Sequence, residues 1–415
     1  MSSQHAGVLV VGGGMAGISA AVESAELGHE VYLVEKAESL GGKVAGMHRY
    51  FPKLCPPYCG LEINYRRIKE NPRISVFTSA EVTKIEGTAG DYTATVKIRP
   101  RYIAEDLTDP IGPYADLEKS VPNGFNFGMD KKRAVQVPHE LAFPYLPVVD
   151  SAVFSNPELK AKVEGLPGVD LTQQDKEMTL KVGSVIWAAG WTPYEVEKVD
   201  YLGYHKYPDV ITNLEMERLA AVNGPTGGKL LRPSDGKPVK RAAFVQCAGS
   251  RDEHHLPYCS TICCMGSLKQ SSYVRESDPE SEVWIFYIDI RANRYEAFYR
   301  KVQDDKNVHL IKGKPGRILR NAAGDMVVVS EDMNSDGIVE VPVDLVVLAS
   351  GMVPATATEK VPYFGADTLV YDKYGFMAPD QGNAAIYPAG CVKRPVDVAS
   401  TVQDASAAAL KATRE

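Results

Sequence analysis

Four of the chain's seven cysteines fall in one short stretch, 246–264, which reads QCAGSRDEHHLPYCSTICC. They are Cys247, Cys259, Cys263 and Cys264, and four thiolates are the soft ligands that a [4Fe–4S] cluster requires. The spacing differs from the C-x2-C-x2-C ferredoxin run, and it lacks the paired C-x2-C spacing that is typical of zinc sites. From spacing alone, a metal cluster and four ordinary buried thiols therefore both stay open.

A second group of chemically meaningful residues is the G-x-G-x-x-G pattern formed by Gly12, Gly14 and Gly17. It lies between a predicted buried strand at 8–11 and a predicted helix whose apolar residues recur at helical spacing. In such a unit the first glycine allows a tight turn, the second lets a pyrophosphate approach, and the third lets helix and strand pack closely. The helix start then offers free N–H groups to phosphates, so we expect a bound dinucleotide.

Later motifs indicate that this dinucleotide is FAD. Glu35 ends the second predicted strand, at the usual distance for an acid that accepts the adenosine ribose hydroxyls. The stretches SLGGKVAG, GSVIWAAGWTP and AAIYPAGCVKRPVDVASTVQDASAAAL resemble the phosphate-side loop, the A-T-G-type strand and the C-terminal flavin motif of two-dinucleotide-binding flavoproteins. Such flavoproteins usually have Asp where this chain has Cys391, which puts that hydrogen bond to the ribityl chain in doubt. The residues predicted to contact FAD are Gly12, Gly14, Met15, Ala16, Gly17, Glu35, Lys36, Gly42, Lys43, Val82, Ala189, Gly190, Gly390, Cys391 and Val398.

A nicotinamide site is not expected. The strand and turn that would hold it read RAAFVQCAGSRDE, in which only Gly249 remains of a phosphate-binding glycine pattern. Cys247 stands in the turn itself, so a pyrophosphate is unable to approach the backbone closely. No Ser/His/Asp arrangement or paired-carboxylate site stands out either. The sequence thus predicts electron transfer, with no acid–base catalytic residue.

The alternation of predicted strands and helices indicates an α/β protein with doubly wound, largely parallel sheets. We expect a Rossmann-type FAD domain at 1–235 and 353–415, with an excursion at about 103–180. A smaller reductase-like domain, a degenerate NAD-binding fold with the four cysteines, is expected at 236–352.

Composition excludes some classes of function. The chain has 415 residues and a formal net charge of −7, which argues against a nucleic-acid surface. It has no apolar run long enough to span a bilayer and no secretory signal pattern, so a cytoplasmic location is expected. Contact with a membrane would then come only through a partner protein.

Several strings together closely resemble the A-type subunit of heterodisulfide reductase, over about residues 6–412. They include FVQCAGSRDEHHLPYCSTICCMGSLKQ, YIDIRA, VVLASGMVP and GGKVAGMHRYFP. The resemblance implies that Cys247, Cys259, Cys263 and Cys264 are ligands of an unusual [4Fe–4S] cluster.

The chain lacks the ferredoxin-type cysteine runs that such subunits usually carry. It is therefore most similar to the corresponding subunit of the quinone-interacting membrane-bound oxidoreductase complex. That resemblance implies electron relay between menaquinone and adenylylsulfate reductase in sulfate reduction, at the inner face of the cytoplasmic membrane, with subunits B and C as partners. Alternatives are a soluble heterodisulfide reductase-like or NAD(P)H-dependent flavin disulfide reductase, and a flavin-bearing assembly subunit with a minor redox role.

Cys55 and Cys59 form a further pair, in FPKLCPPYCGLEI. Pro56 and Pro57 between them exclude a regular helix interior there. A flavin-facing dithiol, ligands at a docking site and inert thiols all stay open.

Overall fold

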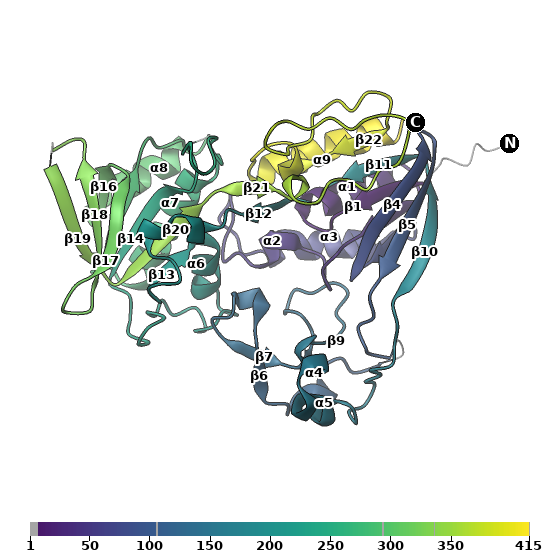
Figure 1. Ribbon diagram of the computed structural model, residues 1–415, viewed down its shortest axis with the longest axis horizontal. Helices are drawn as coiled ribbons and strands as arrows, with labels where there is room; N and C mark the ends of the chain where they lie inside the picture. Colours follow the sequence, from purple (N-terminus) through teal and green to yellow (C-terminus); the bar gives the residue numbers. More distant parts are fainter. Residues whose placement is uncertain (1–6, 105–106, 293, 336, 415) are drawn as a thin grey trace.

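The computed structural model describes residues 7–104, 107–292, 294–335 and 337–414. The described chain forms two layered domains and a smaller lobe (Figure 1). The first domain comprises 7–102, 176–193 and 353–414, the second comprises 194–352, and the inserted lobe comprises 103–175.

The first domain is built on a five-stranded parallel sheet with the order β22-β11-β1-β2-β3. Its central strands are short apolar runs that are buried on both faces, as is typical of parallel sheets. Helices α1, α3 and α9 pack on one face, and the antiparallel sheet β10-β5-β4 covers the other face. The elements are β1 (Val8–Val11), α1 (Met15–Glu26), β2 (Val31–Val34), α2 (Gly42–Ala45), α3 (Tyr58–Glu70), β3 (Ile74–Phe77), β4 (Ala80–Thr88), β5 (Asp91–Ile98), β10 (Lys176–Val182), β11 (Ser184–Trp187), β22 (Ile386–Pro388) and α9 (Val398–Ala412).

The second domain repeats this layering. Its five-stranded parallel sheet has the order β13-β20-β14-β15-β16, and an antiparallel sheet β17-β18-β19 lies beside it (Figure 1). Helix α7 packs against the central strands through Met265 and Leu268, which are buried in the core with Phe244 and Ile285. The elements are β13 (Val210–Thr212), α6 (Asn213–Ala220), β14 (Arg241–Ala248), α7 (Cys263–Ser277), β15 (Glu282–Tyr287), α8 (Glu296–Gln303), β16 (Val308–Lys312), β17 (Pro315–Arg320), β18 (Met326–Asp332), β19 (Gly337–Val343) and β20 (Leu345–Ser350).

The chain crosses between the two domains twice, through strands that pair with each other. These strands are β12 (Trp191–Pro193) and β21 (Met352–Pro354), which run antiparallel. The second domain therefore begins directly after β12, and the predicted boundary at 235 is too late. The reason is that β13 pairs in parallel with β20 and so belongs to the second sheet.

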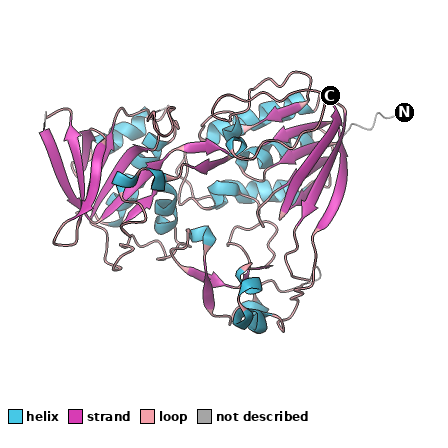
Figure 2. Cartoon of the chain, viewed as in Figure 1, coloured by secondary structure: helices cyan, strands magenta, loops and turns pink. Residues whose placement is uncertain are grey.

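The inserted lobe has its own small apolar core and consists mainly of loops with short elements (Figure 2). It ends before β10, because that strand pairs with β5 in the first domain, so the predicted excursion to 180 is slightly too long. Its core comprises Ile103, Tyr114, Val121, Ala134, Val135, Val149, Val153 and Val163. Its elements are β6 (Lys119–Pro122), β7 (Lys131–Arg133), β8 (Val135–Gln136), β9 (Val148–Val149), α4 (Ala152–Ser155) and α5 (Pro157–Val163).

No helix among the described residues is both long enough and apolar enough to pass through a membrane.

Candidate functional site

The glycine turn after β1 has the close packing that its sequence predicts. Gly12 has a φ of +106°, and the start of α1 packs directly on it. A Cβ atom on Gly17 would lie 1.7 Å from the carbonyl oxygen of Gly12, so only glycine fits there. Gly14, the N-cap of α1, provides no side-chain hydrogen bond to the helix. The first N–H groups of α1 are therefore available to an anionic ligand.

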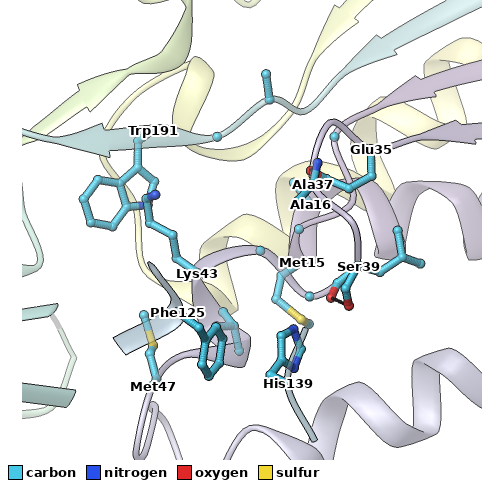
Figure 3. Close-up of a pocket in the computed structure, with 18 of the residues that line it drawn as sticks. Met15, Ala16, Glu35, Ala37, Ser39, Lys43, Met47, Phe125, His139 and Trp191 are labelled. Carbon is cyan, nitrogen blue, oxygen red and sulfur yellow. Dashed lines mark hydrogen bonds between the residues drawn. The ribbon is translucent and has the colours of Figure 1, made fainter. Parts of the chain in front are cut away.

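Glu35 lies beside this turn with its carboxylate held by backbone groups. The N–H of Gly13 donates to one carboxylate oxygen, and the N–H of Ala37 donates to the other at 2.7 Å. Burial raises the pKa of Glu35, and these hydrogen bonds oppose that shift. The side chain borders the cavity described below, where its remaining lone pairs are able to accept hydroxyl groups (Figure 3).

A second glycine turn faces the first one. The N–H of Gly41 donates to the carbonyl of Gly13, and a Cβ atom on Gly42 would lie 2.9 Å from the Cα of Gly14. Lys43 follows, and its ammonium lies 5.2 Å from the ring centroid of Trp191 (Figure 3). Burial lowers the pKa of Lys43. Two backbone turns and one cation thus line the same space.

The C-terminal motif provides another wall. Gly390 has a φ of +69° and packs against Ala16, at the start of α1. The thiol of Cys391 contacts the carbonyl of Val396 at 3.7 Å, and burial raises its pKa to about 11. Asp397 caps α9 by accepting the N–H of Ser400 at 2.7 Å. A carboxylate thus borders the cavity six residues after the position where an Asp is usual.

These elements enclose a cavity of about 1180 Å³. Of the predicted residues, eleven line it: Gly12, Gly14, Met15, Ala16, Glu35, Gly42, Lys43, Ala189, Gly190, Cys391 and Val398. The inserted lobe contributes Phe125 and His139, whose rings stack with centroids 4.5 Å apart (Figure 3). Burial lowers the pKa of His139 to about 4. Sequence reasoning missed this contribution, because neither residue lies in a recognisable motif.

Four predicted contact residues do not line the cavity. Gly17 packs against Gly12, and Gly390 packs against Ala16, so both glycines lie outside the cavity lining. The ammonium of Lys36 points to the surface, where it pairs with Glu81 at 3.1 Å and Glu359 at 3.0 Å. Val82 is only 5% exposed because its side chain faces the core between the two sheets of the first domain. Lys36 and Val82 were predicted to contact FAD, but their side chains point away from the cavity.

The four cysteines of 246–264 gather at the carboxyl ends of strands in the second domain. Cys247 lies at the end of the central strand β14 with a φ of +58°. Cys263 and Cys264 form the first turn of α7 and point apart. The thiol of Cys263 contacts the carbonyl of Ser350 at 3.7 Å, and that of Cys264 contacts the carbonyl of Asp289 at 3.5 Å. Cys259 lies in the preceding loop, where its sulfur accepts the N–H of Thr261 at 3.3 Å.

The four thiols are near enough to affect one another electrostatically. Burial raises the pKa of Cys263 well above its ordinary value, and Cys247, Cys264 and Cys259 raise it further. Burial likewise raises the pKa of Cys247 to about 11. Within the described residues, no three His, Cys, Asp or Glu side chains meet closely enough to hold one metal ion. The thiolates of a [4Fe–4S] cluster bind separate iron atoms, so they do not have to meet at one metal ion.

The cavity and the cysteine loop share a wall. Thr261, Ile262 and Met265 line the cavity, and Cys263 and Cys264 stand between them in the chain. Ile262 also packs against Cys391 of the C-terminal motif and against Met352 of β21. A redox centre on the cysteines would therefore adjoin the part of the cavity that the start of α9 borders.

A tyrosine side chain packs against the turn after β14. Gly249 has a φ of +79°, and a Cβ atom there would lie 2.3 Å from the ring of Tyr194. The hydroxyl of Tyr194 is 2.8 Å from Nδ1 of His255, which fixes the ring over the turn. A side chain thus occupies the space in front of the backbone that a pyrophosphate would approach.

Comparison with known proteins agrees with this geometry. A family model described as "FAD dependent oxidoreductase" matches residues 7–65. Among solved structures, thioredoxin reductase from T. acidophilum has a TM-score of 0.55 and 16% identity, over 99% of this chain and 99% of its own. The Lactococcus lactis thioredoxin reductase has a TM-score of 0.53 and 13% identity, over 99% of this chain and 98% of its own. The fold is thus that of these thioredoxin reductases, and the matched residues 7–65 are similar to FAD-dependent oxidoreductases.

Curated relatives indicate a more specific group of similar proteins. The chain is 35% identical to an A-type iron-sulfur subunit of the CoB–CoM heterodisulfide reductase of Methanopyrus kandleri, over 97% of this chain and 63% of the relative. It is 34% identical to the A-type subunit of the H(2):CoB-CoM heterodisulfide,ferredoxin reductase of Methanothermobacter thermautotrophicus, with the same coverage. The chain is therefore similar to the A-type subunits of heterodisulfide reductases and spans about 63% of the length of these relatives.

The relatives correct the predicted partners. Their names describe subunits of heterodisulfide reductases, including a ferredoxin- and F(420)H(2)-dependent one from Methanosarcina acetivorans that is 34% identical over 97% of this chain. The expected partnership with adenylylsulfate reductase and with subunits B and C of a quinone-interacting complex is thus wrong. The resemblance to the A-type subunit of heterodisulfide reductase is confirmed, and the soluble heterodisulfide reductase-like alternative fits better than the membrane-linked interpretation.

Proposed function

We propose that the chain is the FAD-containing electron-transfer part of a heterodisulfide reductase-like assembly, with a [4Fe–4S] cluster beside the flavin. The observation that carries the proposal is the shared wall between the cavity and the cysteine loop. Ile262 lines the cavity and precedes Cys263 directly, so the two redox sites are separated by little protein. A flavin in the cavity and a cluster on the cysteines would supply electron transfer between the two sites within one chain.

The lining of the cavity has groups that suit each part of FAD. Glu35 would accept the adenosine ribose hydroxyls, and the turns at Gly12 and Gly42 would hold the pyrophosphate against the start of α1. The start of α9 also borders the cavity, where its positive dipole would stabilise negative charge on the ring system. The bound flavin supplies the ability to take two electrons and release them singly. The chain's own residues place it and shield it from water.

The surroundings of the cysteines suit a cluster. Three of the four cysteines are buried, and the fourth is near the surface. Burial raises the pKa of Cys247 to about 11 and also raises that of Cys264, so without metal both are protonated at neutral pH. Binding of iron must therefore release protons, and the positive metal then compensates the negative charge of the buried thiolates. The start of α7 adds a positive dipole next to Cys263 and Cys264.

We do not expect hydride transfer from a nicotinamide to the flavin. Tyr194 covers the turn at Gly249, which leaves no backbone approach for a pyrophosphate. NADH is therefore expected neither to bind tightly to the isolated chain nor to reduce its flavin.

The test is iron and acid-labile sulfide analysis of protein purified without oxygen, together with an EPR spectrum after reduction. We expect about four irons for each FAD. The Cys263→Ser variant should lose most of this iron and keep its FAD, whereas Cys55→Ser, outside the ligand set, should keep both. Flavin-replete protein that contains no iron under these conditions would refute the cluster.

A further inference from the structure

The inserted lobe is fixed to the first domain directly beside the second glycine turn. The N–H of Phe143 donates to Oγ of Ser39 at 3.0 Å, and the carbonyl of Phe143 accepts the N–H of Leu40 at 2.9 Å. The ring of Phe143 also stacks on that of Tyr65 in α3, with centroids 5.1 Å apart. The lobe segment 139–143 is thereby held at the wall of the cavity, next to that turn.

His139 is the first residue of this segment, and its ring faces the cavity. The carbonyl of His139 accepts the N–H of Ala142 at 3.0 Å, which fixes the backbone in a turn. The ring stacks on Phe125 with centroids 4.5 Å apart and an interplanar angle of 15°. Figure 3 shows the imidazole pointing from the lobe towards Met15, the first residue of α1, which also lines the cavity. The imidazole therefore lies opposite the start of α1, across the space that a dinucleotide would fill.

Arg218 of the second domain holds this ring stack in place. It is only 1% exposed, and its Cζ atom lies 4.4 Å from the ring centroid of Phe125, where a cation is attracted by the negative face of the ring. Its Nε donates to Oδ1 of Asn126 in the lobe at 2.8 Å, and its Nη1 donates to the carbonyl of Gly46 in the first domain at 3.2 Å. All three parts of the chain thus fix Phe125 and, through it, the ring of His139.

The surroundings of His139 decide which of its ring nitrogens carries the proton. Burial lowers the pKa of His139 to about 4, so the ring is neutral at pH 7 and has one N–H. Nδ1 is buried, and within the described part of the chain it has no hydrogen-bond partner. A proton on Nδ1 would leave a buried N–H without an acceptor, which folded proteins rarely tolerate. The tautomer with the proton on Nε2 is therefore favoured, and that N–H is the donor available to a ligand in the cavity.

We propose that His139 is an FAD-binding residue, whose Nε2–H donates a hydrogen bond to an oxygen of the chain that joins the adenosine of FAD to its ring system. This rests on the proposed function, since it takes FAD as the occupant of the cavity. The pyrophosphate and ribityl parts of that chain both offer oxygen acceptors, so one N–H donor suits either part. The bond adds a polar contact to a site in which Cys391, a weak hydrogen-bonding residue, stands in place of the usual Asp.

Two variants of the complete chain separate hydrogen bonding from packing. His139→Phe keeps a ring against Phe125 and removes the donor, whereas His139→Gln removes the ring and keeps an N–H donor of similar reach. FAD-loaded protein is diluted, and the flavin that stays on the chain is measured by its absorbance after gel filtration at successive times. We expect FAD to leave His139→Phe about 2- to 10-fold faster than the wild type, which is the range for loss of one neutral hydrogen bond. His139→Gln should release FAD more slowly than His139→Phe.

His309→Phe is the matched control. The ring of His309 also stacks on an aromatic side chain, with its centroid 5.0 Å from that of Trp284, but His309 does not line the cavity. Its replacement should leave the rate of FAD release unchanged. An unchanged circular dichroism spectrum would show that each variant is folded.

Two results would overturn the assignment of His139. One is release of FAD from His139→Phe at the wild-type rate. The other is faster release from His139→Gln than from His139→Phe, because a role in packing alone predicts that order. Wild-type protein that binds no FAD at all would refute the proposed function together with this contact.

Discussion

Glu217 and Lys269 form a 2.9 Å ion pair inside the protein, with their side chains only 5% and 7% exposed. Glu217 belongs to α6 and Lys269 to α7, and Lys269 also donates to the carbonyl of Arg49 in the first domain. Burial would raise the pKa of Glu217, but Lys269 and the hydrogen bonds from Gln270 and the N–H of His48 lower it overall. The pair thus joins both domains beside the cavity.

Removal of one partner of the Glu217–Lys269 ion pair should strongly destabilise the folded protein. Glu217→Gln leaves the ammonium of Lys269 buried without its counter-charge, so we expect a loss of about 3–5 kcal/mol in the free energy of unfolding. The double variant Glu217→Gln/Lys269→Met should recover much of that loss, because no isolated charge then remains. Chemical denaturation measures both. A single variant as stable as the wild type would contradict the role given to this ion pair.

Gly17 allows a sharp steric test of the glycine turn. Gly17→Ala places a methyl group 1.7 Å from the carbonyl oxygen of Gly12, so the turn must shift. We expect about 1–3 kcal/mol of destabilisation and a strong loss of bound FAD, measured from the flavin absorbance per chain. Gly316→Ala is the matched control, since nothing lies within 4 Å of its added Cβ atom. Full FAD occupancy in Gly17→Ala would count against the turn as a pyrophosphate site.

Glu35 and Lys36 are adjacent at the end of β2, and they allow a charge that borders the cavity to be compared with a charge on the surface. Glu35→Ala removes an acceptor that borders the cavity, and a hydrogen bond to a charged group contributes about 1.5–3 kcal/mol. The Kd for FAD should therefore rise by about 10- to 100-fold. Lys36→Ala breaks only surface ion pairs and should leave FAD affinity unchanged. Fluorescence titration of the apoprotein measures both, and equal effects would refute the assignment of Glu35.

His139 predicts a dependence of stability on pH. Its folded-state pKa of about 4 lies below the ordinary value of 6.5, because burial disfavours the charged ring. Between these values the unfolded chain binds more protons, so the free energy of unfolding should fall as the pH falls from 6.5 towards 4, by at most about 3 kcal/mol.

Thermal unfolding at pH 7 and at pH 4.5 measures the effect of His139. His139→Phe keeps a ring against Phe125 but does not titrate, so its melting temperature should depend less on pH in this window. If both proteins lose the same stability on acidification, other groups are responsible.

The local patterns of the sequence predicted the parts of the site that depend on neighbouring residues. The turn at Gly12 and the acid at Glu35 follow from steric and hydrogen-bonding rules within one βαβ unit. The inserted lobe's contribution through Phe125 was not predictable, because it depends on packing between distant segments. Arg218 shows this dependence, because it contacts two segments that lie far from it in the sequence. Its Cζ atom lies 4.4 Å from the ring centroid of Phe125, and its guanidinium donates to Asn126 and to the carbonyl of Gly46.

Short elements explain the misplaced boundary. β13 spans only Val210–Thr212, which is too short for its pattern to assign it to a sheet, so its membership of the second sheet depends on pairing with β20, far along the chain. Val82 is a similar case. Its position in β4 was predicted to contact FAD, but the alternation of strand side chains directs it into the core.

The second domain is inserted within the first, and this order has a consequence for biogenesis. β22 and α9 leave the ribosome after the whole second domain, although they complete the sheet and the cavity that begin with β1 and α1. Domains fold largely as units during synthesis, so the second domain can form while the first domain still lacks its last strand and helix. The proposed cluster would then be inserted before the flavin binds, and a nascent chain halted before β22 should bind iron without FAD.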